Sequence, residues 1–186
     1  MLMRLRLHCL AMTIILCSMP ALAQLTSKES DLVTAVKGNS MEDVERAFIH
    51  GANPNERTRE GQPVLQIAAK ASASRMVRVL LEKGARCDTQ DSNGITALQI
   101  SADNNDPEIT AMLLAQKANP NIADHHGETA LMKGVRHGAT DVVRLLLAGG
   151  ADVNATEFSG RTALSFAKEA RLPGMVQILK YAGAKD

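Results

Sequence analysis

Between residues 124 and 155, apolar side chains recur at the spacing of a helix in two short runs. The first run, residues 131–135, follows Thr129, a residue type that is favoured at the N-cap position of helices. The second run, residues 142–147, ends near Gly150, and glycine accepts the left-handed backbone that commonly closes a helix. The pattern predicts a helix, a turn and a second helix, followed by a loop. A unit of this size cannot bury its own apolar face, so it must stack on similar units.

The same pattern recurs every 33 residues along the chain, without insertion or deletion. Glycine opens four of the units, at Gly61, Gly94, Gly127 and Gly160. The pairs that close the units are Gly51-Ala52, Gly84-Ala85, Lys117-Ala118, Gly150-Ala151 and Gly183-Ala184. A fixed period of this length is the signature of a stacked repeat protein. The predicted fold is therefore all-α, a solenoid of about five helix–turn–helix–loop units that cover approximately residues 26–57, 58–90, 91–123, 124–156 and 157–186.

These units resemble those of the ankyrin repeat family over roughly residues 26–186. The resemblance rests on Thr96-Ala97-Leu98-Gln99, Thr129-Ala130-Leu131-Met132 and Thr162-Ala163-Leu164-Ser165 at the helix starts, on residues 142–147, and on residues 150–155. The histidine that usually ends the family's Thr-Pro-Leu-His motif is replaced here by Gln66, Gln99, Met132 or Ser165. The resemblance implies an ankyrin repeat solenoid that binds another protein.

Two details of the third unit carry further predictions. Asp106, Pro107 and Glu108 form a clear helix start, with an N-cap residue, a proline in the first turn and an acidic residue that the helix dipole favours. Lys117 stands where each of the other four units has a glycine. We therefore expect a left-handed backbone at Lys117, which is unusual for a residue with a Cβ atom.

The first 23 residues read as a secretory signal that is separate from the repeats. Arg4 and Arg6 provide the positive start, residues 9–17 the short apolar core, and Ala21-Leu22-Ala23 the cleavage site. An apolar core of this length is too short for a bilayer, which needs about 20 residues. The sequence therefore predicts a cleaved signal peptide at residues 1–23 and a mature ankyrin repeat domain at residues 24–186. The predicted location is the periplasm, without a membrane attachment after cleavage.

Charge and cysteine content limit the classes of partner. Without the two signal arginines, 19 Lys and Arg residues remain against 20 Asp and Glu residues, which is no basic footprint for nucleic acid. Cys87 is then the one remaining cysteine and cannot form an internal disulfide. We expect it to be a small packed side chain, with a redox or intermolecular role as the alternative.

The sequence shows no catalytic constellation and no phosphate-binding glycine-rich loop, so we expect neither an enzyme nor a cofactor. Three histidines, His125, His126 and His137, are expected on one side of the fourth unit. They admit three interpretations: a zinc or copper site, contacts with a partner, or solvated surface. No cysteine and no regular ligand spacing accompanies them, so we expect no metal site.

The positions that vary between units lie at the expected loop tips and at the ends of the first helices. The ankyrin resemblance implies that such positions contact the partner. The predicted partner-binding residues are Arg59, Glu60, Lys70, Ser92, Asn93, Ile95, Asp103, Asn104, His125, His126, Arg136, His137, Phe158 and Arg161. Phe158 is an aromatic residue at a tip where the fold needs none, and aromatic residues dominate many interfaces. The alternative is that its ring folds back onto its own unit.

The expected function is that of an exported, non-enzymatic module that binds and modulates or protects another protein, expected to be periplasmic, and that is a monomer when free. Small exported ankyrin proteins, which the chain resembles, include some linked to periplasmic catalase activity and oxidative-stress resistance. Others are immunity-type inhibitors of a toxic or peptidoglycan-cleaving enzyme, and this is the alternative function. An enzyme built on the histidines and an effector delivered to a host cell are the remaining classes, and neither has a supporting motif.

Overall fold

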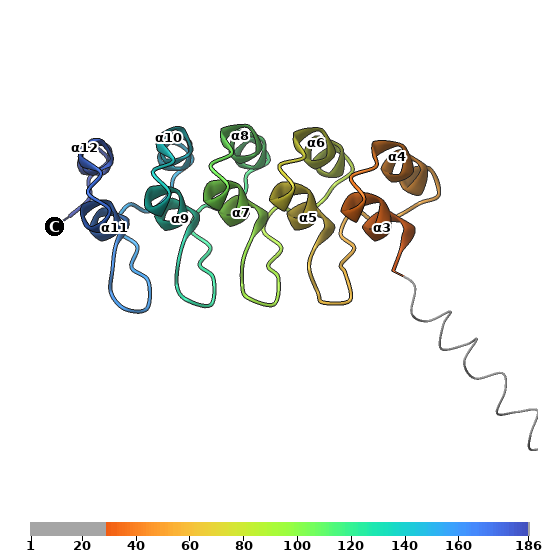
Figure 1. Cartoon of the computed structure of the whole chain (residues 1–186), viewed down its shortest axis with the longest axis horizontal. Coiled ribbons are helices and arrows are strands. Elements are labelled where there is room, and N and C mark those ends of the chain that lie inside the picture. The colour runs from red at the N-terminus through yellow and green to blue at the C-terminus, as the bar shows by residue number, and fades with distance from the viewer. Residues whose placement is uncertain (1–28, 186) are drawn as a thin grey trace, which may run out of the picture. The chain divides into compact units, whose positions relative to one another are not determined.

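The computed structural model describes residues 29–185, and from Asp31 onward the chain forms one compact unit. The predicted signal peptide and the predicted new N-terminus, Gln24, lie outside the described residues. Ten helices occur in the described part, in five consecutive pairs (Figure 1). The pairs are α3 (Asp31–Lys37) with α4 (Met41–Ile49), α5 (Val64–Lys70) with α6 (Ser74–Glu82), α7 (Ala97–Asp103) with α8 (Pro107–Ala115), α9 (Ala130–Arg136) with α10 (Thr140–Ala148), and α11 (Ala163–Glu169) with α12 (Pro173–Tyr181).

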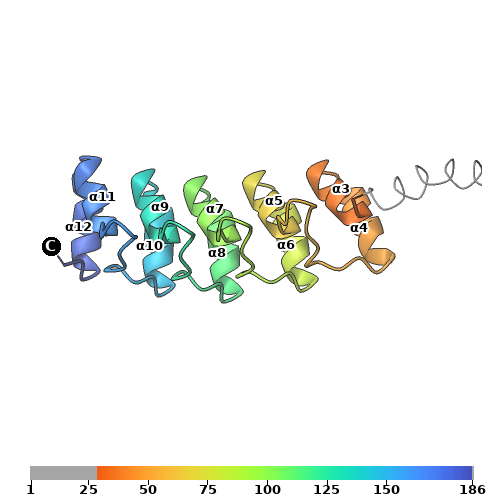
Figure 2. The same cartoon turned by 90° about the horizontal axis from the view of Figure 1, so that it is seen from below.

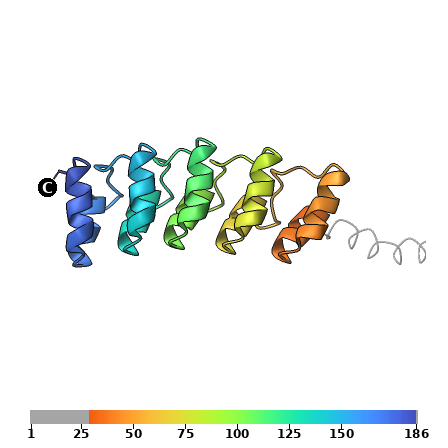
Figure 3. The same cartoon turned by 90° about the horizontal axis from the view of Figure 1, so that it is seen from above.

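The helices form two layers, with the odd-numbered helices in one layer and the even-numbered helices in the other (Figure 1). Between successive pairs, a long loop extends beyond the odd-numbered layer, on the side away from the even-numbered helices (Figure 1). The views from below and above show the five pairs following one another in chain order (Figure 2 and Figure 3). The described residues contain isolated bridges at Arg57–Pro63 and Thr156–Thr162 but no strand. The predicted all-α repeat solenoid is confirmed.

Each helix is only seven or nine residues long, which is too short for stability in isolation. Stability comes instead from packing between neighbouring pairs. In α10, for example, Val142, Val143 and Leu146 are fully buried, and their contacts belong to one continuous core that runs through the pairs. Within residues 29–185, no helix has the length and apolar character needed to cross a membrane.

The helix starts follow the sequence closely, with one correction. The side chain of Asp106 accepts a hydrogen bond from the amide of Ile109, and Pro107 occupies the first turn, which confirms the predicted start of α8. Thr129 does occupy the N-cap position of α9, but its hydroxyl makes no capping hydrogen bond and is buried without a partner. Met132, three residues later, has no side-chain oxygen with which to complete a capping box.

Gln66 and Gln99 join successive repeats from the position at which the family usually has histidine. The side-chain amide of Gln99 donates to the carbonyl oxygens of Ile122 and Glu128, at 3.2 and 2.7 Å. Gln66 makes the corresponding bonds to the next repeat, at 3.0 and 2.7 Å. Neither Met132 nor Ser165 makes such a bond to a following repeat within the described residues.

The loops that close the units repeat a second connection, made by asparagine. The side-chain amides of Asn55, Asn121 and Asn154 each donate to the carbonyl oxygen of the closing glycine in the next unit. The third unit departs at both positions, because Asp88 replaces the asparagine and Lys117 replaces the glycine. Lys117 has a φ of 62°, so the predicted left-handed backbone is confirmed.

Candidate functional site

Three of the loop tips are built around an acidic side chain that accepts backbone hydrogen bonds. One carboxylate oxygen of Asp91 accepts from the amides of Asn93 and Ile95, at 2.8 and 2.9 Å. Asp124 and Glu157 occupy the corresponding positions in the next two units and accept the corresponding pairs of amides. The carboxylates therefore fix the conformation of these exposed turns. In the second unit, Thr58 takes this position and its hydroxyl accepts only one such bond, from the amide of Gln62.

Neighbouring tips of the last three units are joined through their backbones. The amide of His125 donates to the carbonyl oxygen of Asn93 at 3.0 Å, and the amide of Phe158 donates to that of His126 at 3.2 Å. The tips approach so closely that a Cβ atom on Gly94 would lie 2.7 Å from the His125 ring. A Cβ atom on Gly127 would lie 2.8 Å from the Phe158 ring. Glycine is therefore required at both positions. The last three tips thus form a continuous, hydrogen-bonded ridge.

The tips of the second and third units do not touch in this way. No backbone hydrogen bond joins them in the part of the chain that the structure describes, and the space around Gly61 is open. Near the tips, Arg57 connects these loops through its side chain, which donates to the carbonyl oxygens of Gly61 and Gln90 at 2.6 and 2.9 Å. A hollow of about 390 Å³ opens where the tips separate. Its lining includes seven of the predicted partner-binding residues: Glu60, Lys70, Ser92, Asn93, Ile95, Asp103 and Asn104.

A chain of charges borders this hollow on the side of the fourth unit. Lys133 is almost fully buried, and its Nζ lies 2.9 Å from a carboxylate oxygen of Asp124 and 3.2 Å from one of Glu128. Arg136 binds the other oxygen of Glu128 at 2.6 Å and lies 3.8 Å from Asp103. The Nε2 atom of His137 lies 3.0 Å from the same oxygen of Asp103. The network holds several exposed side chains in fixed positions.

Burial and pairing act in opposite directions on the two charges at the centre of this network. Burial favours the uncharged carboxyl of Asp124, but hydrogen bonds from Lys133 and from two backbone amides outweigh that effect and lower its pKa. Burial likewise opposes the charge of Lys133, but its two carboxylate partners outweigh it and raise the pKa of the ammonium group. Both groups are therefore ionised at neutral pH.

The fifth unit holds a second charged cluster around Glu157. Ser159 donates hydrogen bonds to this carboxylate from its hydroxyl and its amide, and together with Arg161 these bonds lower the pKa of Glu157 to about 2. Arg161 lies 3.1 Å from Glu157 and 3.7 Å from Glu169, and its guanidinium stacks 4.5 Å from the centre of the Phe166 ring. Arg161 is thus held by its own unit.

A family model for ankyrin repeats, in three copies, matches residues 32–124 and again residues 102–185. The two overlapping matches span nearly the whole described chain. The chain belongs to the ankyrin repeat family. A search of curated protein sequences finds no match to this ankyrin chain. Ankyrin repeats are in general non-enzymatic modules that bind other proteins, and this is the class of function that the family assigns to the chain.

The ankyrin fold places the predicted partner-binding residues on one surface. We call this the inner surface: the loop tips at residues 57–60, 90–93, 123–126 and 156–159, the adjoining Ile95 and Arg161, and the C-terminal ends of α5, α7, α9 and α11. All fourteen are exposed except Ile95, which is half-buried. Arg59 lies at a tip but outside the hollow. Asn104 also has a structural role, because its side-chain amide donates to carbonyl oxygens at the end of α5.

Phe158 follows neither of the two interpretations completely. Phe158 is 80% exposed, yet its ring lies against Gly127 of the preceding ankyrin unit. Its position is therefore fixed by the ridge while most of the ring faces solvent. A fixed, exposed aromatic ring is suited to an interface because little side-chain freedom is lost on binding.

The inner surface contains charged side chains that were not among the predicted residues, above all Lys133, Asp124 and Glu128. The sequence does contain a signal for them. Lys133 occupies the helix position that is Ile67, Ile100 and Phe166 in the second, third and fifth ankyrin units, and a charge at a packed, otherwise apolar position requires a partner.

The three histidines do not assemble into a ligand set. His137 binds Asp103, and His125 packs over Gly94. Over residues 29–185, no group of three or more His, Cys, Asp or Glu residues is arranged to hold a metal ion. Cys87 is half-buried against the ankyrin core, and burial, with a contribution from Asp88, raises the pKa of its thiol.

Proposed function

We propose that this protein is exported to the periplasm and there binds another protein through the inner surface, so as to modulate or protect that partner. The observation that carries the proposal is the ridge of loop tips bonded to one another beside the hollow. A surface whose turns are already fixed loses little conformational freedom on binding, which favours affinity. The ridge and the hollow together offer a protein partner both a raised and a recessed contact.

Charge on the inner surface determines which partner surfaces fit the proposed contact. Lys70, Asp103, Arg136 and Glu169 occupy the same position in successive units, so positive and negative side chains alternate along the row. Such a row selects a partner with the complementary alternation and repels one in the wrong register, because charges at interfaces act mainly on specificity. The row gives no preference to a uniformly charged partner such as nucleic acid.

The test is capture of proteins from a periplasmic extract with the purified protein, followed by mass spectrometry and measurement of affinity. Phe158→Ala and Lys70→Glu, both on the inner surface, should weaken binding at least tenfold, whereas Ile49→Ala should not. Ile49 is a matched control because it is 82% exposed on α4, in the other layer. Arg136→Ala is a poor test, since it would also leave Glu128 without its closest partner. Sensitivity to Ile49→Ala alone would disprove the proposed surface.

Export has its own test, because binding does not depend on it. Protein isolated from the cell envelope should begin at Gln24, after the Ala21-Leu22-Ala23 site. An intact Met1 in that fraction would contradict export by a cleaved signal. If a partner is found, catalase activity with and without the protein tests the proposed link to oxidative-stress resistance. Inhibition of a toxic or wall-cleaving enzyme would instead favour the immunity-type function.

A further inference from the structure

In the first two of the four intervals between units, ion pairs at two equivalent positions join the even-numbered helices. Between α6 and α8, Arg78 lies 3.6 Å from Glu108, and the hydroxyl of Ser74 donates to the same carboxylate at 2.8 Å. Between α4 and α6 the signs are reversed: Glu45 stands at the position of Arg78 and lies 3.7 Å from Arg75, which stands at the position of Glu108. These two positions therefore face each other across the interval between successive units.

The last interval, between α10 and α12, has only one half of this arrangement. Two repeats after Ser74 and Arg78, α10 carries Thr140 and Arg144, a hydroxyl and a guanidinium in the same places. Two repeats after Glu108, however, α12 carries Gly174. Within residues 29–185, Arg144 forms no ion pair. The groups that hold a carboxylate between the second and third units are thus repeated here without the carboxylate.

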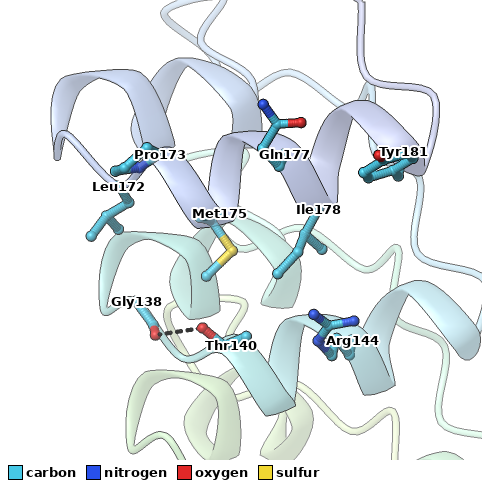
Figure 4. Close-up of a pocket in the computed structure, with 10 residues that line it drawn as sticks. Gly138, Thr140, Arg144, Leu172, Pro173, Met175, Gln177, Ile178 and Tyr181 are labelled. Atoms are coloured by element: carbon cyan, nitrogen blue, oxygen red, sulfur yellow. Dashed lines mark hydrogen bonds between the residues drawn. The ribbon is translucent and has the colours of Figure 1, made fainter.

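A groove occupies the place of the missing side chain. It has a volume of about 750 Å³, and its lining includes Gly174. Arg144 also lines it (Figure 4). Met175 and Ile178 extend from α12 toward α10 and give the groove an apolar wall (Figure 4). Tyr181, which is 90% exposed, stands at the same end as Arg144 (Figure 4). We call this the outer groove; it lies in the even-numbered layer, away from the loop tips (Figure 1).

We propose that the outer groove binds a segment of a partner protein that presents an Asp or Glu side chain among apolar residues. The carboxylate of that segment takes the place of Glu108, and Arg144 acts as Arg78 does. The hydroxyl of Thr140 donates to the carbonyl oxygen of Gly138 at 3.4 Å and turns from it to the carboxylate, as Ser74 does to Glu108. Its apolar neighbours cover Met175 and Ile178. A guanidinium and a hydroxyl donate to a carboxylate but cannot pair with a cationic segment, so charge complementarity selects the acidic one. This site is independent of the inner surface and does not rest on the function proposed above.

Gly174 provides a direct test, because the missing carboxylate can be supplied from within the chain. An added Cβ on Gly174 would meet no atom within 4 Å, and the residue does not have a positive φ. Gly174→Glu is therefore expected to fold normally and to place its carboxylate beside Arg144. Gly174→Gln has the same size without the charge and is the matched control. Circular dichroism of each variant checks that the fold is retained.

The probe is a phage-displayed library of short random peptides, selected on the purified protein and counter-selected on the Gly174→Glu variant. Enriched peptides should share an acidic residue flanked by apolar ones. Their affinity, measured by fluorescence anisotropy, should fall about tenfold or more with Gly174→Glu or Arg144→Gln and stay close to wild type with Gly174→Gln and Phe158→Ala. Replacing the peptide's acidic residue by its amide should weaken binding to the wild type but not to Arg144→Gln.

Three results would overturn the proposal. One is a selection that enriches no peptides, or enriches peptides that share no acidic residue. Another is equal loss of affinity with Gly174→Glu and Gly174→Gln, which would mean that bulk and not charge excludes the peptide. The third is an affinity that Arg144→Gln leaves unchanged.

Discussion

Pro63→Thr should stabilise the protein, because it supplies two groups that the second unit lacks. In the third unit, the hydroxyl of Thr96 accepts from the amide of Gln99, and the amide of Thr96 donates to the side-chain oxygen of Gln99 at 2.8 Å. The corresponding residues in the second unit are Pro63 and Gln66. Proline has neither a hydroxyl nor an N–H group, and the side-chain oxygen of Gln66 is accordingly buried without a hydrogen-bond partner.

Three terms set the size of the effect. An N-cap hydroxyl contributes about 0.5–2 kcal/mol, and pairing a buried acceptor that was left unsatisfied contributes about 1–3 kcal/mol. Against these, losing proline gives the unfolded chain more freedom, which costs about 0.4–1 kcal/mol. Pro63 already has an extended backbone, with φ −63° and ψ 142°, which threonine adopts without strain. The expected net gain is about 0.5–2 kcal/mol, because imperfect geometry of the new hydrogen bonds reduces the upper part of the range.

Urea unfolding followed by circular dichroism measures the gain, and each kcal/mol should raise the melting temperature by about 2–4 °C. Pro63→Val is the matched control: it restores the N–H group without the hydroxyl and should recover only part of the gain. Thr96→Pro should produce the opposite change in the third unit. In a Gln66→Met background only the contribution of the N-cap hydroxyl should remain, so the reasoning would be refuted by a gain from Pro63→Thr that is as large there as in the wild type, because the buried oxygen would then be irrelevant.

Four further outcomes can be checked separately. Lys117→Gly relieves a left-handed backbone and should raise the free energy of unfolding in urea by about zero to 1 kcal/mol, after allowance for glycine's freedom in the unfolded chain; a loss above about 1 kcal/mol would contradict this. Asp88→Asn supplies a donor for the Lys117 carbonyl and should add about 0.5–1.5 kcal/mol by the same measurement; no gain would show that the bond does not form. Lys133→Met leaves Asp124 buried without its cation and should cost about 3–5 kcal/mol at neutral pH. Since the folded-state pKa of Asp124 is lowered, its stabilisation is present above about pH 4 and lost below, so melts at lower pH should show a smaller cost. Cys87 should react with a thiol reagent much more slowly in the folded protein than in urea, because burial raises its pKa; equal rates would disprove its packed position.

The sequence was sufficient for the features that depend on local pattern. The period of the apolar residues placed all five helix pairs, and the comparison of equivalent positions identified the left-handed backbone at Lys117. The sequence was insufficient where a residue's role depends on a partner that only the folded unit brings to it. The contacts of Lys133 with Asp124 and Glu128, and the lack of a donor for Gln66, each lie within a single unit and appear only in the folded structure.

The outer groove is a second feature that could not be predicted from the sequence alone. The variable loop tips predict binding at the inner surface, and a hollow lies there. The larger cavity lies between α10 and α12, and its position follows from a comparison that the sequence permits but does not motivate. Only the observed pairings of Arg78 with Glu108 and of Glu45 with Arg75 show that these positions face each other, and hence that Gly174 leaves Arg144 without its equivalent partner.

The hollow on the inner surface has a physical origin in a single position of the repeat. Where that position is acidic, at Asp91, Asp124 and Glu157, the turn is closed by two backbone hydrogen bonds. Where it is Thr58, the tip receives only one bond and does not meet the next tip. A rigid ridge over three units and an open interval beside it thus arise from one difference in side-chain chemistry. A partner that uses both must fit the ridge as it stands, whereas the tip at Thr58 has room to adjust, so specificity is expected to depend on the ridge and adaptation on the second unit.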